Sequence, residues 1–206
     1  MIKDGIPFVL IPLVAALLLA SLTPYWYVAL LLIMLALFMA YFFRDPERAS
    51  LAEQDIVVSP ADGRVTRVAR VIPEDPQSPT VVSIFLSVFD VHVNRAPIAG
   101  EIVDVAYTKG RFMIATREEA SVVNEQNALT IRGERMTIVC KQIAGVLARR
   151  IVCWKRRGER VALGERFGLI KFSSRTDLVL PPEVEVSVRV GDRVRGAVSI
   201  IGRLRG

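Results

Sequence analysis

A serine set among large apolar residues is the candidate nucleophile of this 206-residue chain, and it lies in the run Phe172 to Asp177. If that run is a strand, its side chains alternate between two faces. Ser174 then shares one face with Ile170, Phe172, Thr176 and Leu178, whereas Lys171, Ser173, Arg175 and Asp177 share the other. A serine hydroxyl becomes a nucleophile when a base activates it. Taken alone, Ser174 is more simply interpreted as a small core hydroxyl bonded to a neighbouring carbonyl.

The candidate base is His92, the only histidine in the chain. On a strand, Asp90, His92 and Asn94 fall on one face, and the earlier residues of that face are apolar: Ile84, Leu86 and Val88. A strand face that turns polar at its end is expected of a site at the rim of a β-core. Histidine moves protons well near neutral pH. The alternative is a structural or surface histidine.

A carboxylate that could orient the histidine is Asp62, in the sequence Ser59-Pro60-Ala61-Asp62-Gly63. A serine, a base that takes its proton and a carboxylate that holds the base form a catalytic triad. Considered locally, Asp62 before a glycine is typical of an Asx-turn, which is a purely structural role.

Four segments in a fixed order resemble a known family. They are Tyr41–Arg48, Ser59–Gly63, Ile84–Pro97 and Phe172–Asp177. From about residue 41 to the end, the chain resembles the short bacterial and archaeal form of phosphatidylserine decarboxylase. The resemblance is specific because the segments occur together and in order, whereas none of them alone would identify the family.

The resemblance implies a self-cleaving precursor. In this family an aspartate, a histidine and a serine act as a protease-like triad, and these match Asp62, His92 and Ser174. Ser174 would attack the carbonyl of Ser173 and form an ester by an N-to-O acyl shift. Elimination and hydrolysis would then leave a pyruvoyl group at position 174. The products would be a long β chain, Met1 to Ser173, and a short α chain beginning with the pyruvoyl group.

The pyruvoyl group is the implied cofactor, and the implied reaction converts phosphatidylserine to phosphatidylethanolamine. The group would take up the electrons released when carbon dioxide leaves, a role played elsewhere by pyridoxal phosphate. His92 would return a proton to the carbon that loses carbon dioxide. An archaeal ether lipid with a serine headgroup is an alternative substrate, and the residues near the site do not separate the two.

The chain departs from the family pattern at the cleavage site. The family usually has glycine before the serine, and here Ser173 stands in that place. A side chain there could slow the acyl shift, because glycine most easily accepts an unusual backbone conformation. The Ser173 hydroxyl could also compete as a nucleophile.

Two further departures concern the supporting residues. Longer members carry the pattern His-x-x-His, but His92 is followed by Arg95, so His92 must serve both cleavage and decarboxylation. Asn124 and Glu125 resemble an Asn-Glu-Arg motif that has lost its arginine, which suggests a supporting role. Asp90 is the alternative base if His92 is not the one.

The elements that must position these residues are predicted to be strands. Stretches rich in β-branched residues and separated by turn residues are Ile56–Val58, Val65–Ile72, Thr80–Phe89, Gly100–Tyr107, Ala128–Ile131, Met136–Gln142, Val146–Trp154 and Val184–Val190. Residues Met113 to Asn124 are expected to form a short helix or a loop. The pattern predicts an all-β sandwich or barrel. Ser59–Val65 and Val190–Gly196 resemble the hybrid-motif β-domains of biotinyl and lipoyl carriers.

The N-terminal segment predicts a membrane hairpin. No residue from Gly5 to Phe43 is charged, which is long enough for two spans, and Pro24 among aromatic residues marks the middle. We expect transmembrane helices over Ile6–Leu22 and Trp26–Phe43. Residues 1–43 would then be the hairpin and 44–206 the catalytic domain. A cleaved signal peptide followed by one anchor is the alternative.

The distribution of charged residues predicts on which side of the membrane the catalytic domain lies. Lys3, Arg44 and Arg48 flank the apolar segment, so both ends are expected in the cytoplasm and the catalytic domain on the cytoplasmic side of the cell membrane. The net charge is +6, with a basic cluster between Arg149 and Arg160 that would attract anionic lipid headgroups. The tether and the lack of an aromatic platform argue against nucleic-acid binding.

Three questions of class and assembly remain at this point. Cys140 and Cys153 are too few and too far apart for a metal site, so no metal is expected. The sequence does not decide between a monomer and a homo-oligomer. The competing class is a non-enzymatic β-barrel scaffold on a membrane hairpin, which would need neither Ser174 nor His92.

Overall fold

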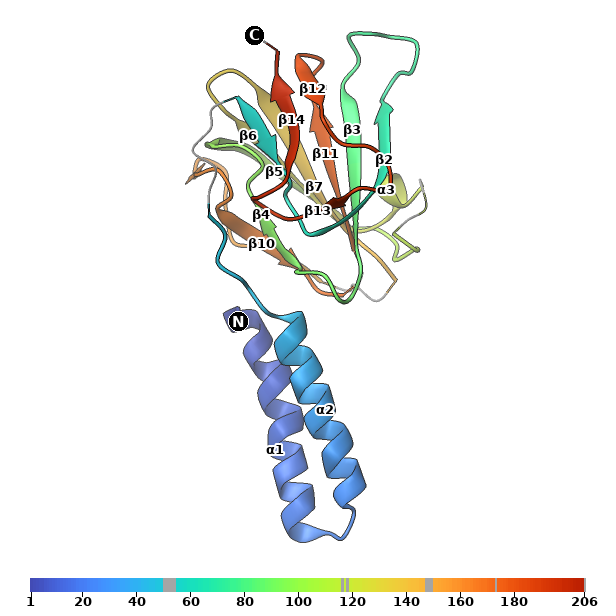
Figure 1. Cartoon of the computed structure of the whole chain (residues 1–206), viewed down its shortest axis with the longest axis vertical. Helices are drawn as coiled ribbons and strands as arrows, with labels where there is room; N and C mark the ends of the chain where they lie inside the picture. Colours follow the sequence, from blue (N-terminus) through green and yellow to red (C-terminus); the bar gives the residue numbers. More distant parts are fainter. Residues whose placement is uncertain (50–54, 116, 118, 147–149, 173, 206) are drawn as a thin grey trace. The chain divides into compact units, whose positions relative to one another are not determined.

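The computed structural model describes residues 1–206 except 50–54, 116, 118, 147–149, 173 and 206. The chain divides into two compact units, Met1–Glu47 and Arg48–Gly206, each of which is described by itself (Figure 1).

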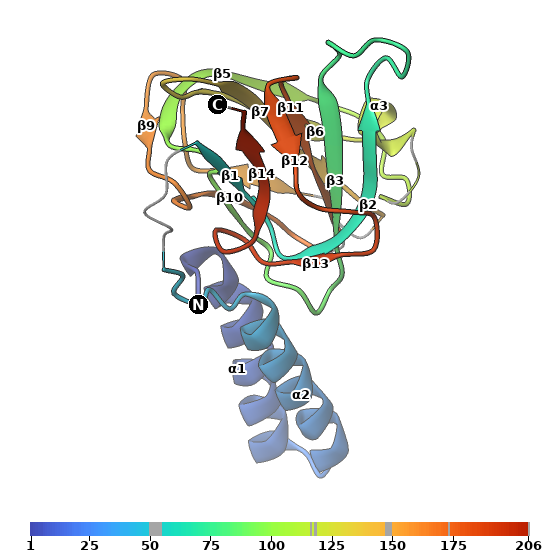
Figure 2. The ribbon, with the colours of Figure 1, turned by 45° about the horizontal axis from the view of Figure 1, so that its top comes forward.

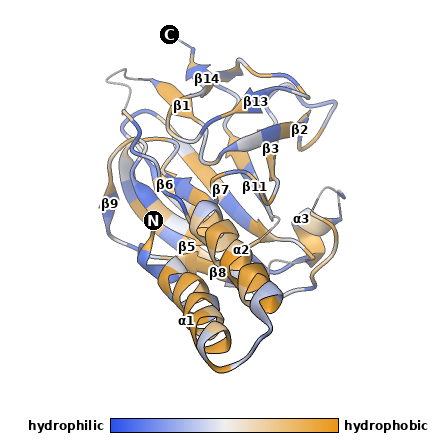
Figure 3. Ribbon diagram, turned by 60° about the horizontal axis from the view of Figure 1, so that its bottom comes forward, coloured by the Kyte–Doolittle hydropathy of each residue, from blue (hydrophilic) through white to orange (hydrophobic). Residues whose placement is uncertain are grey.

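The N-terminal unit is a helical hairpin. A short 3-10 turn (Lys3–Gly5) leads into α1 (Ile6–Leu22), and α2 (Trp26–Phe42) returns alongside it. Both helices are apolar all round (Figure 3), with small buried side chains at Ala16, Ala29 and Ala36. Small residues let two helices approach closely in a lipid environment. The helical segment Lys3–Leu22 is long and apolar enough to cross a membrane, and α2 is a shorter apolar helix.

The second unit is mostly β and is built on one curled antiparallel sheet (Figure 2). The strand order is β13-β2-β3-β11-β7-β6-β5-β9. The strands are β2 (Gly63–Arg70), β3 (Thr80–Leu86), β5 (Gly100–Thr108), β6 (Gln126–Arg132), β7 (Thr137–Ala144), β9 (Arg160–Val161), β11 (Ser174–Leu180) and β13 (Arg193–Val194). The predicted mostly-β fold class is confirmed.

Two three-stranded sheets complete the unit. One has the order β1-β14-β12 and the other β4-β10-β8. Their strands are β1 (Ile56–Val58), β14 (Ile200–Leu204), β12 (Val184–Val186), β4 (Val93–Arg95), β10 (Arg166–Ile170) and β8 (Ile151–Cys153). The one helix in the described part of this unit is α3 (Ala120–Val123).

Alternating side chains explain why these segments pair as strands. In β6, Asn127, Leu129 and Ile131 are buried and the residues between them are not. In β7, Ile138 and Cys140 continue the same inward face. One apolar core holds these side chains together with those of β2, β3 and β11. Burial of this apolar surface is the main stabilising contribution to such a domain.

The structure corrects the two strands that carry the candidate site. The predicted continuous strand from Ile170 through Ser174 is wrong, because β10 ends at Ile170 and Phe172 adopts a φ of 66°. β11 then begins at Ser174 in the large sheet. The predicted strand through His92 is also wrong, because β3 ends at Leu86 and a turn separates it from β4. Within β11 the predicted alternation holds.

Other boundaries move by shorter distances. The strands expected over Val146–Trp154 and Val184–Val190 are shorter, as β8 and β12 show. Residues 147–149 lie outside the described part of the chain. Within Met113–Asn124, where a short helix or loop was expected, α3 forms one turn of helix.

Candidate active site

Ser174 is the first residue of an interior strand. It pairs with Leu86 of β3 on one side and with Ala144 of β7 on the other. Its side chain is fully buried, and its Oγ has no hydrogen-bond partner among the residues that the structure describes. Because buried polar groups are normally hydrogen-bonded, such a hydroxyl calls for an explanation, and a chemical role is one.

The chain turns a corner immediately before this serine. Phe172 has a φ of 66°, a left-handed conformation that is uncommon for a bulky residue. Such a residue costs on the order of 1–3 kcal/mol, and strained residues of this kind cluster at functional sites. The corner takes the chain from the sheet of β10 to the sheet of β11. Ser173, between the two, lies outside the described residues.

His92 is buried on the chain that leads into β4. Its Nδ1 lies 2.9 Å from the backbone oxygen of Asp90. Because a carbonyl oxygen only accepts, Nδ1 carries a proton in this contact, and in the neutral ring Nε2 is the basic nitrogen. The backbone oxygen of His92 accepts a hydrogen bond of 3.4 Å from the Ile170 N–H. His92 is thereby tied to the segment that ends at the corner before Ser174.

A chain of buried amide side chains links β4, which directly follows His92, to β11, which begins with Ser174. Asn94 donates from Nδ2 to Thr176 Oγ1 at 3.3 Å. Gln142 donates from Nε2 to Asn94 Oδ1 at 2.9 Å, and Asn127 donates from Nδ2 to Gln142 Oε1 at 3.0 Å. Asn94 and Thr176 stand two positions after His92 and Ser174, respectively. The network therefore fixes β4 and β11 relative to each other.

Strand alternation puts Asn94 and Thr176 on the faces of His92 and Ser174, but it does not predict their contact. Nor does it predict a role for Gln142 or Asn127. Their signal was present, since each stands at a position where the strand alternation predicts an apolar core residue. A polar residue at such a position is informative because burying it without a partner is costly.

Asp62 lies in the bend between β1 and β2. Its Oδ1 accepts a hydrogen bond of 2.7 Å from the Gly196 N–H, and its Oδ2 forms an ion pair of 2.8 Å with Arg48. The bend itself reaches the chain after His92, because the Arg95 N–H donates to the Pro60 oxygen at 2.9 Å. The Asp62 carboxylate thus contacts Gly196 and Arg48, and its pairing with His92 stays a prediction.

Asp90 closes the turn that follows β3. Its Oδ2 accepts from the Ser87 N–H at 2.9 Å and from the Ser87 hydroxyl at 2.7 Å. The same residue's backbone oxygen holds the His92 ring. Asp90 therefore contributes to the position of His92, and its role as an alternative base is untested.

Asn124 fastens the long β5–β6 connection to the sheet beside Ser174. Its Nδ2 donates to the oxygens of Met113 at 2.9 Å and Ala144 at 2.7 Å, and its Oδ1 accepts from the Met113 N–H at 2.9 Å. The Glu125 oxygen accepts from the Ala144 N–H at 2.9 Å. Both residues are thus attached to the neighbour of Ser174, and their supporting role in the reaction stays a prediction.

The opposite face of β11 carries a buried ion pair. Arg175 donates from Nε and Nη2 to the two carboxylate oxygens of Asp177, at 2.6 and 2.8 Å. Its Nη1 donates to the backbone oxygen of Arg117 at 3.1 Å. This bidentate pair satisfies both charges and attaches the β5–β6 connection to the strand that begins with Ser174.

The two thiols are poor candidates for chemistry. Burial raises the pKa of both Cys140 and Cys153, so neither is a thiolate at neutral pH. Among the described residues, no group of three or more His, Cys, Asp or Glu side chains could hold a metal ion.

The fold and the site define a class of protein. A buried serine begins an interior strand of a β-domain, and a buried histidine is bonded to the chain just before it, as in a serine-dependent β-domain enzyme. The family model "Phosphatidylserine decarboxylase" matches residues 35–202. The chain belongs to the phosphatidylserine decarboxylase family.

Individual relatives agree with the family match. A phosphatidylserine decarboxylase proenzyme of Solibacter usitatus is 55% identical over 175 residues, covering 85% of this chain and 83% of the relative. Proteins of the same name are 42% identical in Magnetococcus marinus (99% of this chain, 95% of the relative) and 46% identical in Symbiobacterium thermophilum (98% and 94%). These relatives are thus matched along most of their length.

Proposed function

We propose that this chain is a proenzyme that cuts itself between Ser173 and Ser174 and then decarboxylates phosphatidylserine to phosphatidylethanolamine. The observation that carries the proposal is the buried Ser174 hydroxyl, which has no hydrogen-bond partner among the described residues, at the head of β11 in a chain of this family. Family membership makes the chain a decarboxylase, and the names of the relatives indicate a precursor.

Self-cleavage begins with the serine. The Ser174 Oγ adds to the carbonyl carbon of Ser173, the C–N bond breaks as the ester C–O bond forms, and His92 passes the hydroxyl proton to the departing nitrogen. Loss of the Cα proton of residue 174 then expels the Ser173 carboxylate. Water replaces the nitrogen, so ammonia leaves and a pyruvoyl group remains at position 174.

The surroundings of Ser174 fit that cofactor. A pyruvoyl group supplies an electron-withdrawing carbonyl that binds the substrate amine and accepts the electrons released with carbon dioxide. The buried head of β11 would keep water away from it. His92 would return a proton to the carbon that loses carbon dioxide, and Asp90 would hold the ring through its backbone oxygen.

Backbone strain at the corner supports a cut at this place. Phe172, the residue before Ser173, stores conformational strain close to the scissile bond, and cleavage would release it. Ser173→Gly should cleave at least as fast as the parent, because glycine relaxes the backbone at that bond. A much slower glycine variant, measured as fragment formation over time, would mean that the Ser173 hydroxyl takes part in the chemistry.

We further propose a location. The apolar hairpin of α1 and α2 would anchor the chain in the cell membrane with both ends in the cytoplasm, which places residues 44–206 on the cytoplasmic side. The mature enzyme would consist of the β chain Met1–Ser173 and the α chain 174–206, with phosphatidylserine supplied by the same membrane.

Intact-mass measurement of the purified, folded protein tests the proposal. The expected result is two fragments divided before residue 174, the smaller one blocked to N-terminal sequencing, and release of carbon dioxide from phosphatidylserine. Ser174→Ala should remain one chain and be inactive. A folded wild-type protein that stays whole would support the scaffold alternative instead.

A further inference from the structure

Several loops leave the large sheet at the end where β11 begins with Ser174. Ser174 pairs with Leu86 and Ala144, which end β3 and β7. Gln126, the first residue of β6, pairs with Thr108 at the end of β5 and with Ile143 of β7. The turn after β3, the β5–β6 connection and the start of the β7–β8 connection therefore lie at one end of the sheet, the end that carries the candidate site.

These loops present exposed apolar side chains. We define the apolar rim as the side chains of Phe89, Phe112, Ile114, Val122 and Val146, which come from all three connections. Val122 on α3 is 76% exposed. Figure 3 shows hydrophobic colouring on α3 at this end of the unit. Clusters of exposed apolar side chains are uncommon on soluble proteins and often mark a surface that binds a protein or a membrane.

Charges beside the apolar rim indicate what kind of partner it fits. Four described charged residues are exposed on the β5–β6 connection that carries Phe112, Ile114 and Val122. Three of them are basic and one is acidic: Lys109, Arg111, Arg117 and Glu119. Apolar side chains that enter the headgroup region, with basic side chains beside them, are typical of surfaces that bind anionic bilayers. A bilayer containing phosphatidylserine is anionic.

The chemistry of the proposed substrate leads to the same conclusion. The acyl chains of a phospholipid stay in the bilayer, so its headgroup cannot travel far from the membrane surface. The end of the sheet with Ser174 must therefore approach that surface. The side chains at this end would enter the interface together with it.

We infer that the apolar rim is a second membrane contact, separate from the helical hairpin, which inserts into the surface of an anionic bilayer and brings the serine headgroup to position 174. This inference rests on the proposed function for the identity of the headgroup. The hairpin would keep the chain in the membrane, and the apolar rim would orient the catalytic unit on it.

The opposite end of the same sheet offers a matched control. The loop between β2 and β3 lies at the other end of β3 from Leu86 (Figure 1), and its residues Val71 and Ile72 are also exposed. In full-length protein reconstituted in phosphatidylserine vesicles, Ile114→Asp with Val122→Asp should lower bilayer turnover about tenfold or more. Val71→Asp with Ile72→Asp should change it less than about twofold, because no membrane contact is assigned to that end. Turnover of a short-chain, water-soluble phosphatidylserine should be alike in all three proteins.

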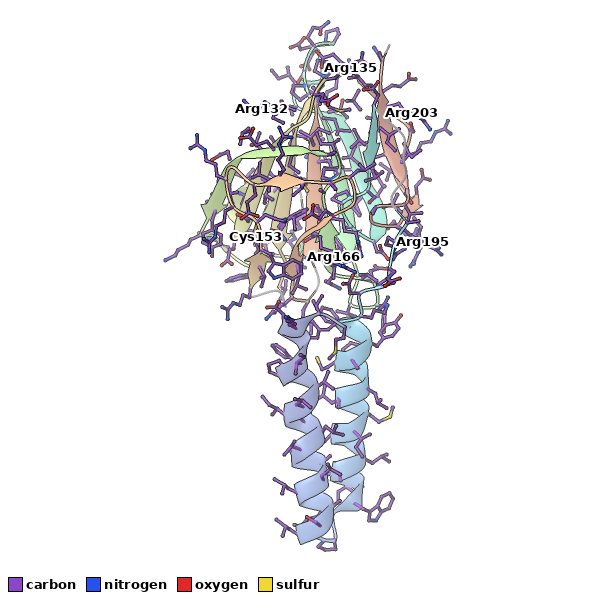
Figure 4. All side chains as sticks on the ribbon, turned by 90° about the vertical axis from the view of Figure 1, so that its left-hand side faces the viewer. Arg132, Arg135, Cys153, Arg166, Arg195 and Arg203 are labelled. Carbon is purple, nitrogen blue, oxygen red and sulfur yellow. The ribbon has the colours of Figure 1, made fainter. Side chains whose placement is uncertain are left out.

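A fluorescence measurement tests the contact without relying on activity. Val122→Trp, in a chain carrying Trp26→Phe and Trp154→Phe, should be quenched by lipids brominated on their acyl chains, whereas Val71→Trp in the same background should not. Self-cleavage on a denaturing gel shows that each variant has folded. Figure 4 shows how densely side chains cover the unit that these variants probe.

The outcomes separate this inference from the proposed function. A chain that stays whole and leaves the soluble lipid untouched contradicts the proposed function, while quenching in the Val122→Trp variant would still support the bilayer contact. Equal bilayer turnover in the two double variants, or no quenching in the Val122→Trp variant, overturns the inference. Crosslinking between copies through position 122 without quenching also overturns it, because the apolar rim would then be a protein interface.

Discussion

The first half of β11 buries polar and charged side chains, whereas the second half buries apolar ones. Ser174, Arg175, Thr176 and Asp177 occupy the first half, and Leu178 and Leu180 face the apolar core from the second. Burying polar groups is unfavourable unless they are paired. Arg175 and Asp177 pair with each other and Thr176 with Asn94, which leaves the Ser174 hydroxyl as the exception among the described residues of the strand. The second half serves stability, and the first half holds the hydroxyl that we propose as the nucleophile.

The strongest test of this contrast removes that hydroxyl. Ser174→Ala should abolish self-cleavage without destabilising the protein, because a buried hydroxyl without a partner contributes nothing favourable. Ser83→Ala is the matched control, since Ser83 Oγ on the neighbouring β3 is also buried without a partner among the described residues. It should cleave normally. Denaturing gels and thermal unfolding measure both properties, and cleavage by Ser174→Ala would contradict the assignment.

The next largest effect is expected at the base. His92→Gln should slow self-cleavage by a factor of about 10²–10⁴, the range for loss of a general base. Asp62→Asn should slow it less, because orienting a base contributes less than being one. Fragment formation followed over time measures both rates. Normal cleavage by His92→Gln would point to Asp90 or a water molecule as the base.

The second half of β11 should respond in the opposite way. Leu178→Ala should lower the free energy of unfolding by about 2–5 kcal/mol, as for other large-to-small changes in a core. Under conditions where the variant is folded, its cleavage rate should match the parent. Denaturant unfolding of the full-length Ser174→Ala background gives the stability change free of cleavage. Slower cleavage in the folded state would mean that the two halves are not separable.

The buried amide network connects the two properties. Asn94→Leu leaves Gln142 and Thr176 with unsatisfied groups, so it should cost about 1–3 kcal/mol of stability. As a positioning residue, Asn94 should also set the maximal cleavage rate. In Asn94→Leu the maximal cleavage rate should therefore fall. The pH at which the rate is half-maximal, which we assign to His92, should stay the same. A shifted midpoint would show that Asn94 acts on the protonation of His92 rather than on its position.

The smallest effect is expected for a partly exposed ion pair. Lys155 Nζ lies 2.6 Å from Glu165 Oε1, and the hydrogen bond from Lys155 lowers the pKa of Glu165. A lowered carboxyl pKa adds stability above the unfolded pKa, which is lost as the pH falls through the folded value. Because both side chains reach solvent in part, water screens the pair, and Glu165→Gln should cost less than about 1 kcal/mol at neutral pH and nothing in strong acid. Unfolding measured at both pH values checks the sign.

Local patterns were enough to predict most of the longer strands and the apolar helices, whereas β4, β9, β10, β13 and β14 were not predicted as strands. β-Branched residues bounded by turn residues predicted β6 and β7, and a two-residue alternation put Ser174 with Thr176 on one face. The corner at Phe172 was missed, since nothing in a phenylalanine signals a positive φ. The turn that ends β3 was missed because Ser87 and Asp90 close it through side-chain hydrogen bonds within a β-rich run.

Long-range contacts explain what else the sequence could not provide. The link from Asn127 through Gln142 to Asn94 joins residues from three strands, and their contact depends on the register of the whole sheet. The surroundings of Asp62 are likewise set by Arg48 and Gly196, which are distant in sequence. Residue types were therefore enough to identify the candidate site residues, whereas the hydrogen bonds among them could be seen only in the folded structure.

The interior place of β11 has a consequence for reversibility. A cut before Ser174 would leave the segment 174–206 held between β3 and β7 by hydrogen bonds on both sides, with β12, β13 and β14 on the same piece. Refolding of the uncut chain is unimolecular, but reassembly of the two pieces would be a bimolecular reaction. The melting temperature of the cut protein should therefore rise with protein concentration, whereas that of Ser174→Ala should not. Maturation would turn a self-contained folding unit into one that is difficult to rebuild once it has come apart.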